Sequence, residues 1–264
     1  MTTDEQLVTF HGNCRFRAYI PTKPGKYSMK VWILADSETF YCGDLQLYAG
    51  GVGSQQDVGQ GSLVVLDLST SIANTGRNIT TDNFFTSYTL ARELMQRRLS
   101  LVGTVCSNRK EIPQSMQPDR SRPTYSSVFG FSSDGVTMVS YVPKPKKAVI
   151  LLSSQHRDAA VTEDEKKKPH IIDYYNQTKA GVDILNKLVR TYSCKRSTRR
   201  WSVAPFFNII DIAAVNTLIL WITKHPEWNQ DKSHLRREFL RNLGMQLVNR
   251  HVQQRMTSTV GKRE

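Results

Sequence analysis

The order of strand-like and helix-like segments is the feature that most constrains the fold of this chain. Residues 29–35 form an apolar run typical of a buried strand, and two short strand candidates follow it at 39–42 and 45–49, which suggests an antiparallel meander. A strand, a helix and another strand come next, at residues 77–81, 88–97 and 101–105. This order predicts an α/β fold: a mixed sheet flanked by helices on both faces.

The middle of the chain has a different character. Residues 107–168 are polar and rich in proline, and they contain three β-like runs at 127–131, 136–141 and 148–152. We expect a β-rich insertion that divides an N-terminal part of the core, residues 1–106, from a second part at 169–230 with two long helices. Residues 231–264 predict a basic amphipathic helix and tail, with Leu235, Phe239 and Leu247 on its inner side. Within the first part, residues 1–26 read as mostly loop.

The charge balance favours a polyanion as partner. The 264 residues include 36 Lys and Arg against 23 Asp and Glu, a net charge of +13. Such a surplus suits phosphates through counterion release, although a merely basic protein is the alternative. The apolar stretch at 203–222 contains Asn208 and Asp211, which would be costly in lipid. We therefore expect a buried core helix there and no membrane contact.

Metal-binding and redox motifs built from cysteine or histidine are not found. The four cysteines, Cys14, Cys42, Cys106 and Cys194, form no C-x-x-C pair, and the six histidines show no zinc spacing. They read as reduced thiols of an intracellular protein. Any metal site must therefore rely on carboxylates.

Three aspartates are the candidates for such a site. Asp36 and Asp82 each follow a predicted strand, and Asp183 lies on a downstream helix. Carboxylates gathered at a sheet edge can hold Mg²⁺, and a pair of ions can clamp the attacking and leaving oxygens of a phosphoryl transfer. An aspartate at a strand end is also common turn chemistry. Spacing leaves other acids open as competitors: Asp44, Asp57, Asp67, Asp173 and Asp211.

The segment 190–201 is a candidate for nucleic-acid binding. It combines Lys195, Arg196, Arg199 and Arg200 with Trp201. Arginine forks suit phosphate oxygens, and exposed aromatic rings suit unstacked bases. The alternative is a solvated basic loop with Trp201 packed into the core.

Several longer motifs carry a resemblance to a known family. They are DEQLVTF (4–10), FRAYIPTKPGKY (16–27), DNFFTS (82–87), VGTVCSNRKEIP (102–113), YYNQTKAGVD (174–183) and RTYSCKRSTRRW (190–201). In this order, over residues 4–249, they resemble the piggyBac family of DNA transposases. The resemblance implies an RNase H-like mixed sheet flanked by helices, with a β-rich insertion before the helix that carries the third aspartate.

The resemblance also implies a site and an activity. Asp36, Asp82 and Asp183 would be the catalytic and metal-binding triad, with two Mg²⁺ ions that Mn²⁺ can replace and Asn186 as an auxiliary ligand. Arg109 and Lys110 would join Lys195, Arg196, Arg199, Arg200 and Trp201 in binding DNA. The implied reaction is cut-and-paste transposition in the nucleus: hydrolysis at the element ends, a hairpin intermediate and joining at TTAA. The implied partners are DNA and a second copy of the chain.

This sequence departs from the family pattern in places. Cys106 stands where many members have arginine, and Asn186 where many have a fourth acid. The preceding DNA-binding region and the Cys-rich zinc module of the family are not in this sequence. These departures suggest a truncated or domesticated DNA-binding protein without catalysis as an alternative. A stand-alone nuclease or phosphatase of the same fold is another.

Overall fold

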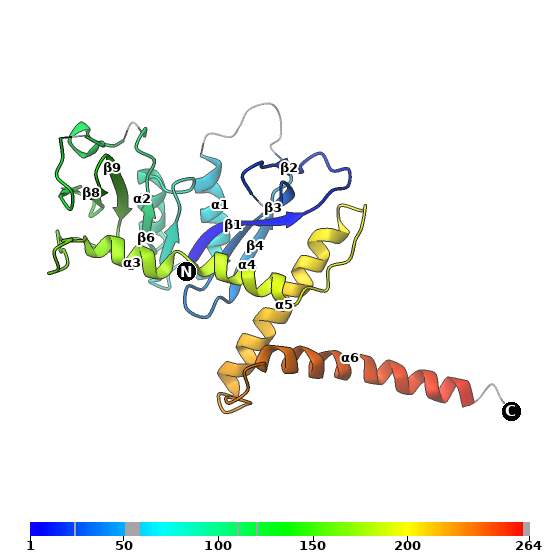
Figure 1. Cartoon of the computed structure of the whole chain (residues 1–264). Coiled ribbons are helices and arrows are strands. Elements are labelled where there is room, and N and C mark those ends of the chain that lie inside the picture. Colours follow the sequence, from blue (N-terminus) through cyan, green and yellow to red (C-terminus); the bar gives the residue numbers. More distant parts are fainter. Residues whose placement is uncertain (24, 51–58, 110, 120, 261–264) are drawn as a thin grey trace.

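One continuous sheet organises the molecule (Figure 1). The computed structural model describes residues 1–23, 25–50, 59–109, 111–119 and 121–260. Within these residues the sheet order is β2-β3-β1-β5-β6-β9-β8-β7, with β4 paired to β3 beside β2. The strands are β1 (Thr2–Thr9), β2 (Ala18–Tyr19), β3 (Tyr27–Ala35), β4 (Cys42–Leu47), β5 (Asn78–Thr81), β6 (Ser100–Thr104), β7 (Ser127–Phe131), β8 (Thr137–Lys144) and β9 (Lys147–Ser153).

The central strand β1 was predicted as loop, and that prediction was wrong. β1 pairs antiparallel with β3 and parallel with β5, so it joins the meander to the parallel part of the sheet. Its buried side chains are largely polar, and Thr2 and Gln6 have tertiary hydrogen-bond partners. The Thr2 hydroxyl donates to the Thr178 carbonyl at 2.5 Å, and the Asn208 amide donates to Gln6 Oε1 at 2.6 Å. Polar residues with such partners can be buried. A strand with buried polar residues gives no apolar pattern in the sequence, so it was not recognised.

Helices cover both faces of the sheet, as predicted. Helices α1 (Gln60–Leu68) and α2 (Tyr88–Gln96) pack on the face that carries Trp32 and Leu34. Helices α3 (His170–Thr178), α4 (Gly181–Thr191) and α5 (Val203–Lys224) cover the opposite face, where Val31 and Ile33 lie against α4 and α5. The Ser87 hydroxyl caps α2 by accepting from Leu90 N at 3.0 Å. The mixed α/β class is therefore confirmed.

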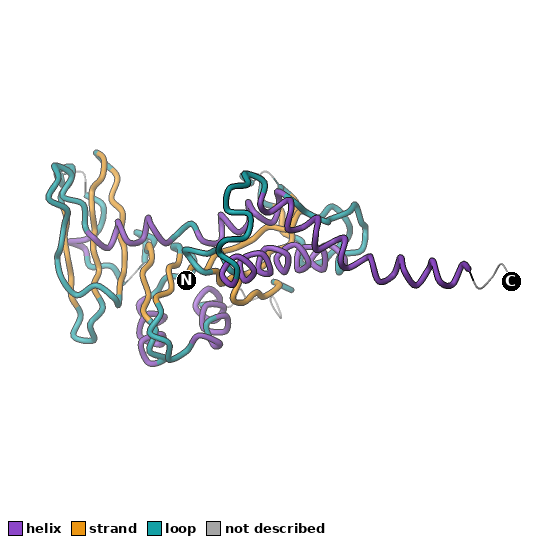
Figure 2. Tube along the Cα trace, turned by 90° about the horizontal axis from the view of Figure 1, so that it is seen from below, coloured by secondary structure: helices purple, strands orange, loops and turns teal. Residues whose placement is uncertain are grey.

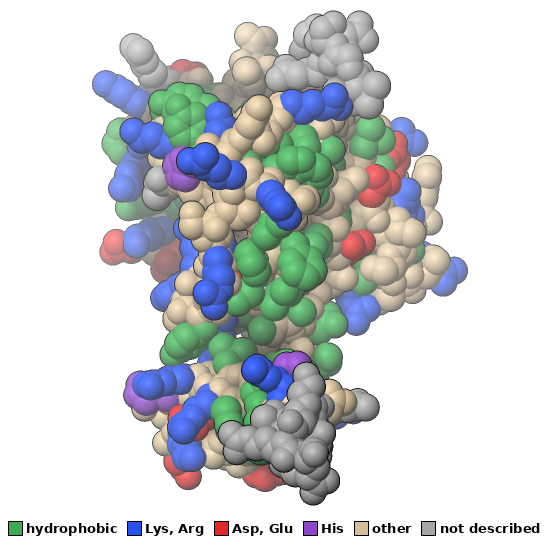
Figure 3. All heavy atoms as spheres, turned by 90° about the vertical axis from the view of Figure 1, so that its right-hand side faces the viewer, with side chains coloured by type: hydrophobic (Ala, Val, Ile, Leu, Met, Phe, Trp, Pro, Cys, Tyr) green, Lys and Arg blue, Asp and Glu red, His purple; other side chains and the backbone are tan. Residues whose placement is uncertain are grey.

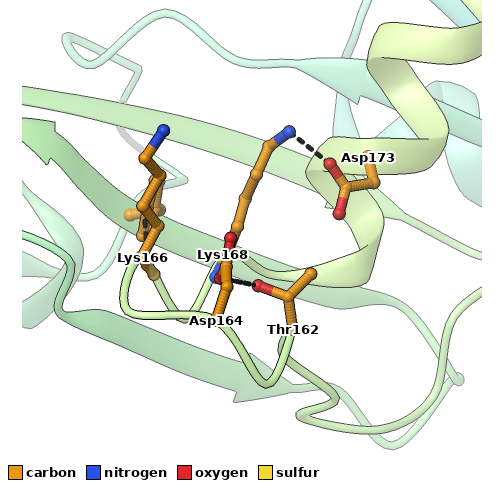
Figure 4. A network of polar contacts seen from close by, with 6 residues as sticks. Thr162, Asp164, Lys166, Lys168 and Asp173 are labelled. Atoms are coloured by element: carbon orange, nitrogen blue, oxygen red, sulfur yellow. Dashed lines mark hydrogen bonds and ion pairs between the residues drawn. The ribbon is translucent and has the colours of Figure 1, made fainter.

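The three predicted strands of the middle region form and extend the same sheet. β9 pairs antiparallel with β6, and β8 and β7 follow outward. The charged turn that ends this region is attached to α3 by an ion pair between Lys168 and Asp173 (Figure 4). Within the turn, the Thr162 hydroxyl donates to Asp164. The domain boundaries drawn from the sequence stay a prediction.

Helices α5 and α6 are less enclosed than predicted. By length and composition α5 could cross a membrane, but one side packs on the sheet and buries Asn208 and Asp211. Its other side exposes apolar residues: Phe206, Ile209, Ile210, Leu220 and Trp221. Helix α6 (Leu235–Val260) leads away from the body (Figures 1 and 2). Phe239 is buried at its beginning, whereas Leu247 is 72% exposed. The amphipathic packing predicted for this helix is thus confined to its first turns.

Candidate functional site

Two aspartates lie side by side on neighbouring parallel strands. The register pairs Thr2 with Thr80 and Thr3 with Thr81, so Asp4 and Asp82 are level one residue further on. Successive side chains of a strand alternate between faces. The Thr2 and Thr80 hydroxyls both contact Thr178. Asp4 and Asp82, two residues beyond them, therefore face the same side of the sheet, on which α3 and α4 pack.

Helix α4 brings a third aspartate to this place. The helix begins at Gly181, where a Cβ atom would lie 2.9 Å from Thr2 Oγ1 and 3.2 Å from the Asp36 carbonyl oxygen. Glycine thus allows the start of the helix to approach β1 closely. Asp183 follows in the first turn of α4, where a carboxylate is favoured by the helix dipole.

The three carboxylates share one cavity of about 130 Å³. Its lining comes from β1, the end of β5 and the α3–α4 junction: Thr2, Thr3, Asp4, Thr80, Thr81, Asp82, Tyr175, Lys179, Ala180 and Asp183. Burial raises the pKa of Asp4 to about 7, and the negative charges of Asp82 and Asp183 add to the effect. Burial also raises the pKa of Asp82. Acids shifted together in a cavity are a mark of functional sites.

Asp36 does not line this cavity, and the triad predicted from the sequence needs a correction. Its Oδ1 accepts hydrogen bonds from Glu38 N at 3.0 Å, Thr39 N at 2.7 Å and Thr39 Oγ1 at 2.9 Å. These bonds lower the pKa of Asp36 against the effect of burial. Because β3 runs antiparallel to β1, its C-terminal end lies beside Thr2, at the start of β1. Asp36 is a turn residue, and Asp4 occupies the place assigned to it.

Sequence reasoning missed three residues of the cavity. Asp4 lies within the DEQLVTF motif, but its strand was not recognised. Lys179 and Tyr175 belong to the YYNQTKAGVD motif, and the Lys179 ammonium lies 5.5 Å from the centre of the Tyr175 ring. The DEQLVTF motif, which is part of the family resemblance, was the available signal for Asp4.

Oxygen atoms dominate the potential metal ligands. No group of three Asp, Glu, His or Cys side chains within the described residues is arranged as a ready metal site. The donor chemistry nonetheless fits a hard divalent cation, which prefers carboxylate and amide oxygens. Asn186, one turn after Asp183, has a buried Oδ1 that lacks a hydrogen-bond partner among the described residues. Asp4, Asp82 and Asp183, with Asn186 beside them, are therefore the residues suited to hold such an ion.

A basic groove leads away from the acids along α4. A cavity of about 520 Å³ has Lys23, Lys187 and Arg190 in its lining, together with Asn186 and the acids Glu5 and Asp183. It shares Leu7, Gly25 and Arg190 with a further cavity of about 550 Å³ that reaches Ser193, Lys195 and Asp211. Since β5 pairs only with the first residues of β1, the later part of β1 forms the floor of this groove.

Of the predicted DNA-binding residues, Lys195 lines this groove. Lys195 donates to the Thr9 carbonyl oxygen, while Arg196, Arg199 and Arg200 are exposed to solvent. Trp201 is 42% exposed, and its ring meets Phe16 edge-on with 5.0 Å between centroids. Arg109 is half-buried in the loop after β6. Lys110 and the competitor Asp57 lie outside the described residues. Lys and Arg side chains are spread around the apolar surface seen in Figure 3.

Comparison with known proteins decides the family. The family described as Transposase IS4 matches residues 1–218. This chain belongs to that transposase family. A solved structure of piggyBac transposase in a synaptic complex with hairpin DNA is 41% identical, with a TM-score of 0.88. The match covers 97% of this chain and 53% of the solved chain, so this transposase spans about half the length of its relative. The piggyBac resemblance and the RNase H-like fold are confirmed.

Proposed function

We propose that this chain is the catalytic region of a piggyBac-like transposase, which cleaves DNA strands and transfers them in a metal-dependent reaction. The observation that supports this most is the shared cavity of Asp4, Asp82 and Asp183. Three carboxylates from two strands and a helix match the donor set that phosphoryl transfer on DNA requires. The proposed partner is DNA, with which the similar piggyBac structure forms a complex.

The carboxylates would hold divalent cations, with Mg²⁺ as the proposed ion, two of them per site, and Mn²⁺ as its substitute. A bound cation of this kind polarises a phosphodiester and makes water or a 3′-hydroxyl a better nucleophile. Asp4 and Asp82 from the sheet and Asp183 from α4 would hold these ions beside the reacting phosphate. Asn186 adds a neutral oxygen where a fourth negative charge would increase repulsion.

Lys179 is suited to contact the scissile phosphate. It lines the acid cavity at the end of α3, and Tyr175 supports its ammonium by a cation–π contact of 5.5 Å. An ammonium here can neutralise charge that develops on the phosphate oxygens. The basic groove along Lys187 and Arg190 would hold the adjacent backbone, and Arg196, Arg199 and Arg200 the flanking duplex.

The proposed sequence of reactions follows the family. Water breaks a phosphodiester bond at the element end and leaves a 3′-hydroxyl, which attacks the opposite strand and forms a hairpin. After the hairpin opens, the freed end joins target DNA at TTAA. This reaction requires access to chromosomal DNA, so we propose that the protein is located in the nucleus. Because an element has two ends to be cut, we also propose that two copies of the chain act as a homodimer.

The test is a strand-cleavage assay on supercoiled DNA and on duplexes with TTAA-flanked ends, in Mg²⁺ or Mn²⁺. We expect Asp4→Ala, Asp82→Ala and Asp183→Ala each to abolish nicking, a loss of at least about a thousandfold for groups that bind the catalytic ion. Each variant should retain the circular dichroism spectrum of the parent.

Asp36→Asn is the matched control, because it removes a carboxylate that does not line the acid cavity. We expect it to cut DNA at the rate of the parent. Nicking that survives loss of Asp4 but disappears with Asp36→Asn would overturn the assignment.

A second candidate is a transposase-derived DNA-binding protein that performs no chemistry. The neutral Asn186 and the lack of a ready metal site in the described residues favour it. It predicts salt-sensitive DNA binding in gel shifts without any nicking in either metal, and Asp4→Ala should then bind DNA at least as tightly as the parent.

A further inference from the structure

A buried carboxylate lies under the beginning of the basic segment. Asp211, in the middle of α5, is 4% exposed. It accepts hydrogen bonds from Ser193 Oγ at 2.5 Å and from Cys194 N at 2.8 Å. Burial of a charge is costly unless it is hydrogen-bonded, and here both bonds come from the segment that precedes Lys195 and Arg196.

The C-terminal helix reaches the same place from the other side. The Arg236 guanidinium, in the first turns of α6, lies 5.2 Å from the centre of the Tyr192 ring. Its three nitrogens are buried and lack hydrogen-bond partners among the described residues. Burial lowers the pKa of Arg236, while Tyr192 and Asp211 act in the opposite direction. Asp211 thus holds the segment through two hydrogen bonds, and Arg236 contacts the segment through the Tyr192 ring.

The remaining anchors of the segment hold it elsewhere along its length. Lys195 Nζ donates to the Thr9 carbonyl oxygen, and Trp201 contacts Phe16 edge-on. A Cβ atom on Gly12 would lie 2.8 Å from the Arg199 carbonyl oxygen, so the segment passes close to this loop. Asp211 is the buried charge at the N-terminal end of this path, where α4 ends and the backbone turns.

We propose that Asp211 is a positioning residue that fixes the basic segment along the groove, and that Arg236 of α6 secures it through Tyr192. This inference rests on the proposed function, since the segment is the part that would contact DNA phosphates. It also gives α6 a structural role, because its first turns contact the DNA-binding segment at Tyr192 and stabilise its path.

Net charge alone predicts that removing Asp211 strengthens DNA binding, whereas a positioning role predicts that it weakens it. Replacing Asp211 by alanine raises the net charge from +13 to +14 (13 + 1). A more positive protein should bind DNA more tightly. If Asp211 positions the segment, its removal weakens DNA binding in spite of the added charge, because the arginines must then be ordered during binding.

The experiment compares Asp211→Ala, Asp211→Asn and Asp67→Ala in the full chain, by DNA-binding titration with a duplex. Asp67 is an exposed residue of α1 on the opposite face of the sheet, so it matches the charge change alone. We expect Asp211→Ala to lose about tenfold in affinity, as for lost hydrogen bonds to a charged group. Asp67→Ala should bind as tightly as the parent or more tightly.

Asp211→Asn removes the negative charge of the side chain but keeps its shape and its capacity for hydrogen bonds. An asparagine can accept from Cys194 N and donate to Ser193 Oγ, so the segment should keep its path and most of its affinity, and trypsin should cut it no faster than in the parent. This variant also serves where Asp211→Ala does not fold. Equal affinity of the parent and Asp211→Ala, or loss in Asp67→Ala of the same size, contradicts the inference.

A thiol readout tests the same contact without DNA. Burial and Asp211 raise the pKa of Cys194 to about 11, and Arg196 opposes this. The pH profile of Cys194 alkylation should therefore move to lower pH in both Asp211 variants, whereas Asp67→Ala should leave it unchanged. If the parent binds no DNA, the proposed function fails, yet the thiol profile and trypsin cleavage at Arg196 still decide whether Asp211 holds the segment.

Discussion

At the scale of single residues, Asp4 shows how position changes the chemistry of a carboxyl group. Asp4 and Asp36 begin with the same intrinsic acidity. Burial near Asp82 and Asp183 raises the pKa of Asp4 to about 7, whereas three donors from its own turn lower that of Asp36. Asp4 lines the acid cavity, and Asp36 stabilises a turn.

The raised pKa of Asp4 makes stability depend on pH. The folded protein holds this proton more tightly than the unfolded chain, so stability falls as pH rises from about 4 to about 7. Asp4→Asn cannot ionise and should avoid this loss. We expect it to be more stable than the parent at pH 8, by up to about 4 kcal/mol for about three pKa units, and equally stable near pH 4. Urea unfolding at both pH values measures this.

Two comparisons check the cause. Asp36→Asn should have the opposite effect and lose stability at pH 8, because Asp36 has a lowered pKa. Adding Mg²⁺ at pH 8 should stabilise the parent and leave Asp4→Asn unchanged, since a ligand that binds only the folded state raises its stability. A parent whose stability is flat between pH 4 and 8 would contradict the burial of Asp4.

At the scale of elements, the start of α4 sets the distance between helix and sheet. Gly181 has no room for a side chain between Thr2 and the Asp36 carbonyl group. Asp183 lies two residues further along the same helix. The distance between Asp183 and the acids of the sheet therefore depends on the absence of a Cβ atom at Gly181.

Gly181→Ala should push α4 away from β1. We expect a loss of about 1–3 kcal/mol in the free energy of unfolding from overpacking, together with slower DNA nicking as Asp183 moves. Gly244→Ala is the matched control, because nothing lies within 4 Å of its Cβ position in α6. That change should be neutral or stabilising by up to about 1 kcal/mol. Chemical denaturation of both variants measures the difference.

At the scale of the whole molecule, the chain has a net charge of +13, and Lys23, Lys187, Arg190 and Lys195 line a groove that begins at the acids. Phosphate binding there should release counterions, so the affinity for DNA should fall steeply as salt increases. The exposed Arg199 belongs to the segment beside this groove, whereas Arg92 lies on α2, across the sheet, in an ion pair of 2.9 Å with Asp134.

Arg199→Ala should lower the slope of log affinity against log salt by about one, because one phosphate contact is lost. Arg92→Ala removes the same charge from the opposite face and should leave the slope unchanged. Fluorescence anisotropy over a range of salt concentrations measures both slopes. Equal slopes for the two variants would mean that net charge, not the groove, governs binding.

Patterns in the amino-acid sequence were sufficient to predict the fold class and the family of this protein. Apolar runs such as residues 29–35 and the cap at Ser87 carry local signals, because hydrophobicity and turn chemistry act over a few residues. The motifs around Asp82 and Asp183 were equally readable, and the structure brings these two acids together.

Tertiary contacts were needed to identify Asp4 as the third acid of the cavity and Asp211 as the support of the basic segment. Asp36 follows an apolar strand and has the local pattern expected of a ligand, whereas β1 is polar and has no such pattern. Pairing of β1 with β5 places Asp4 beside Asp82, and α5 places Asp211 beneath Ser193. Such neighbours are far apart in the chain, and their contacts follow from sheet register and helix packing, which no local pattern encodes.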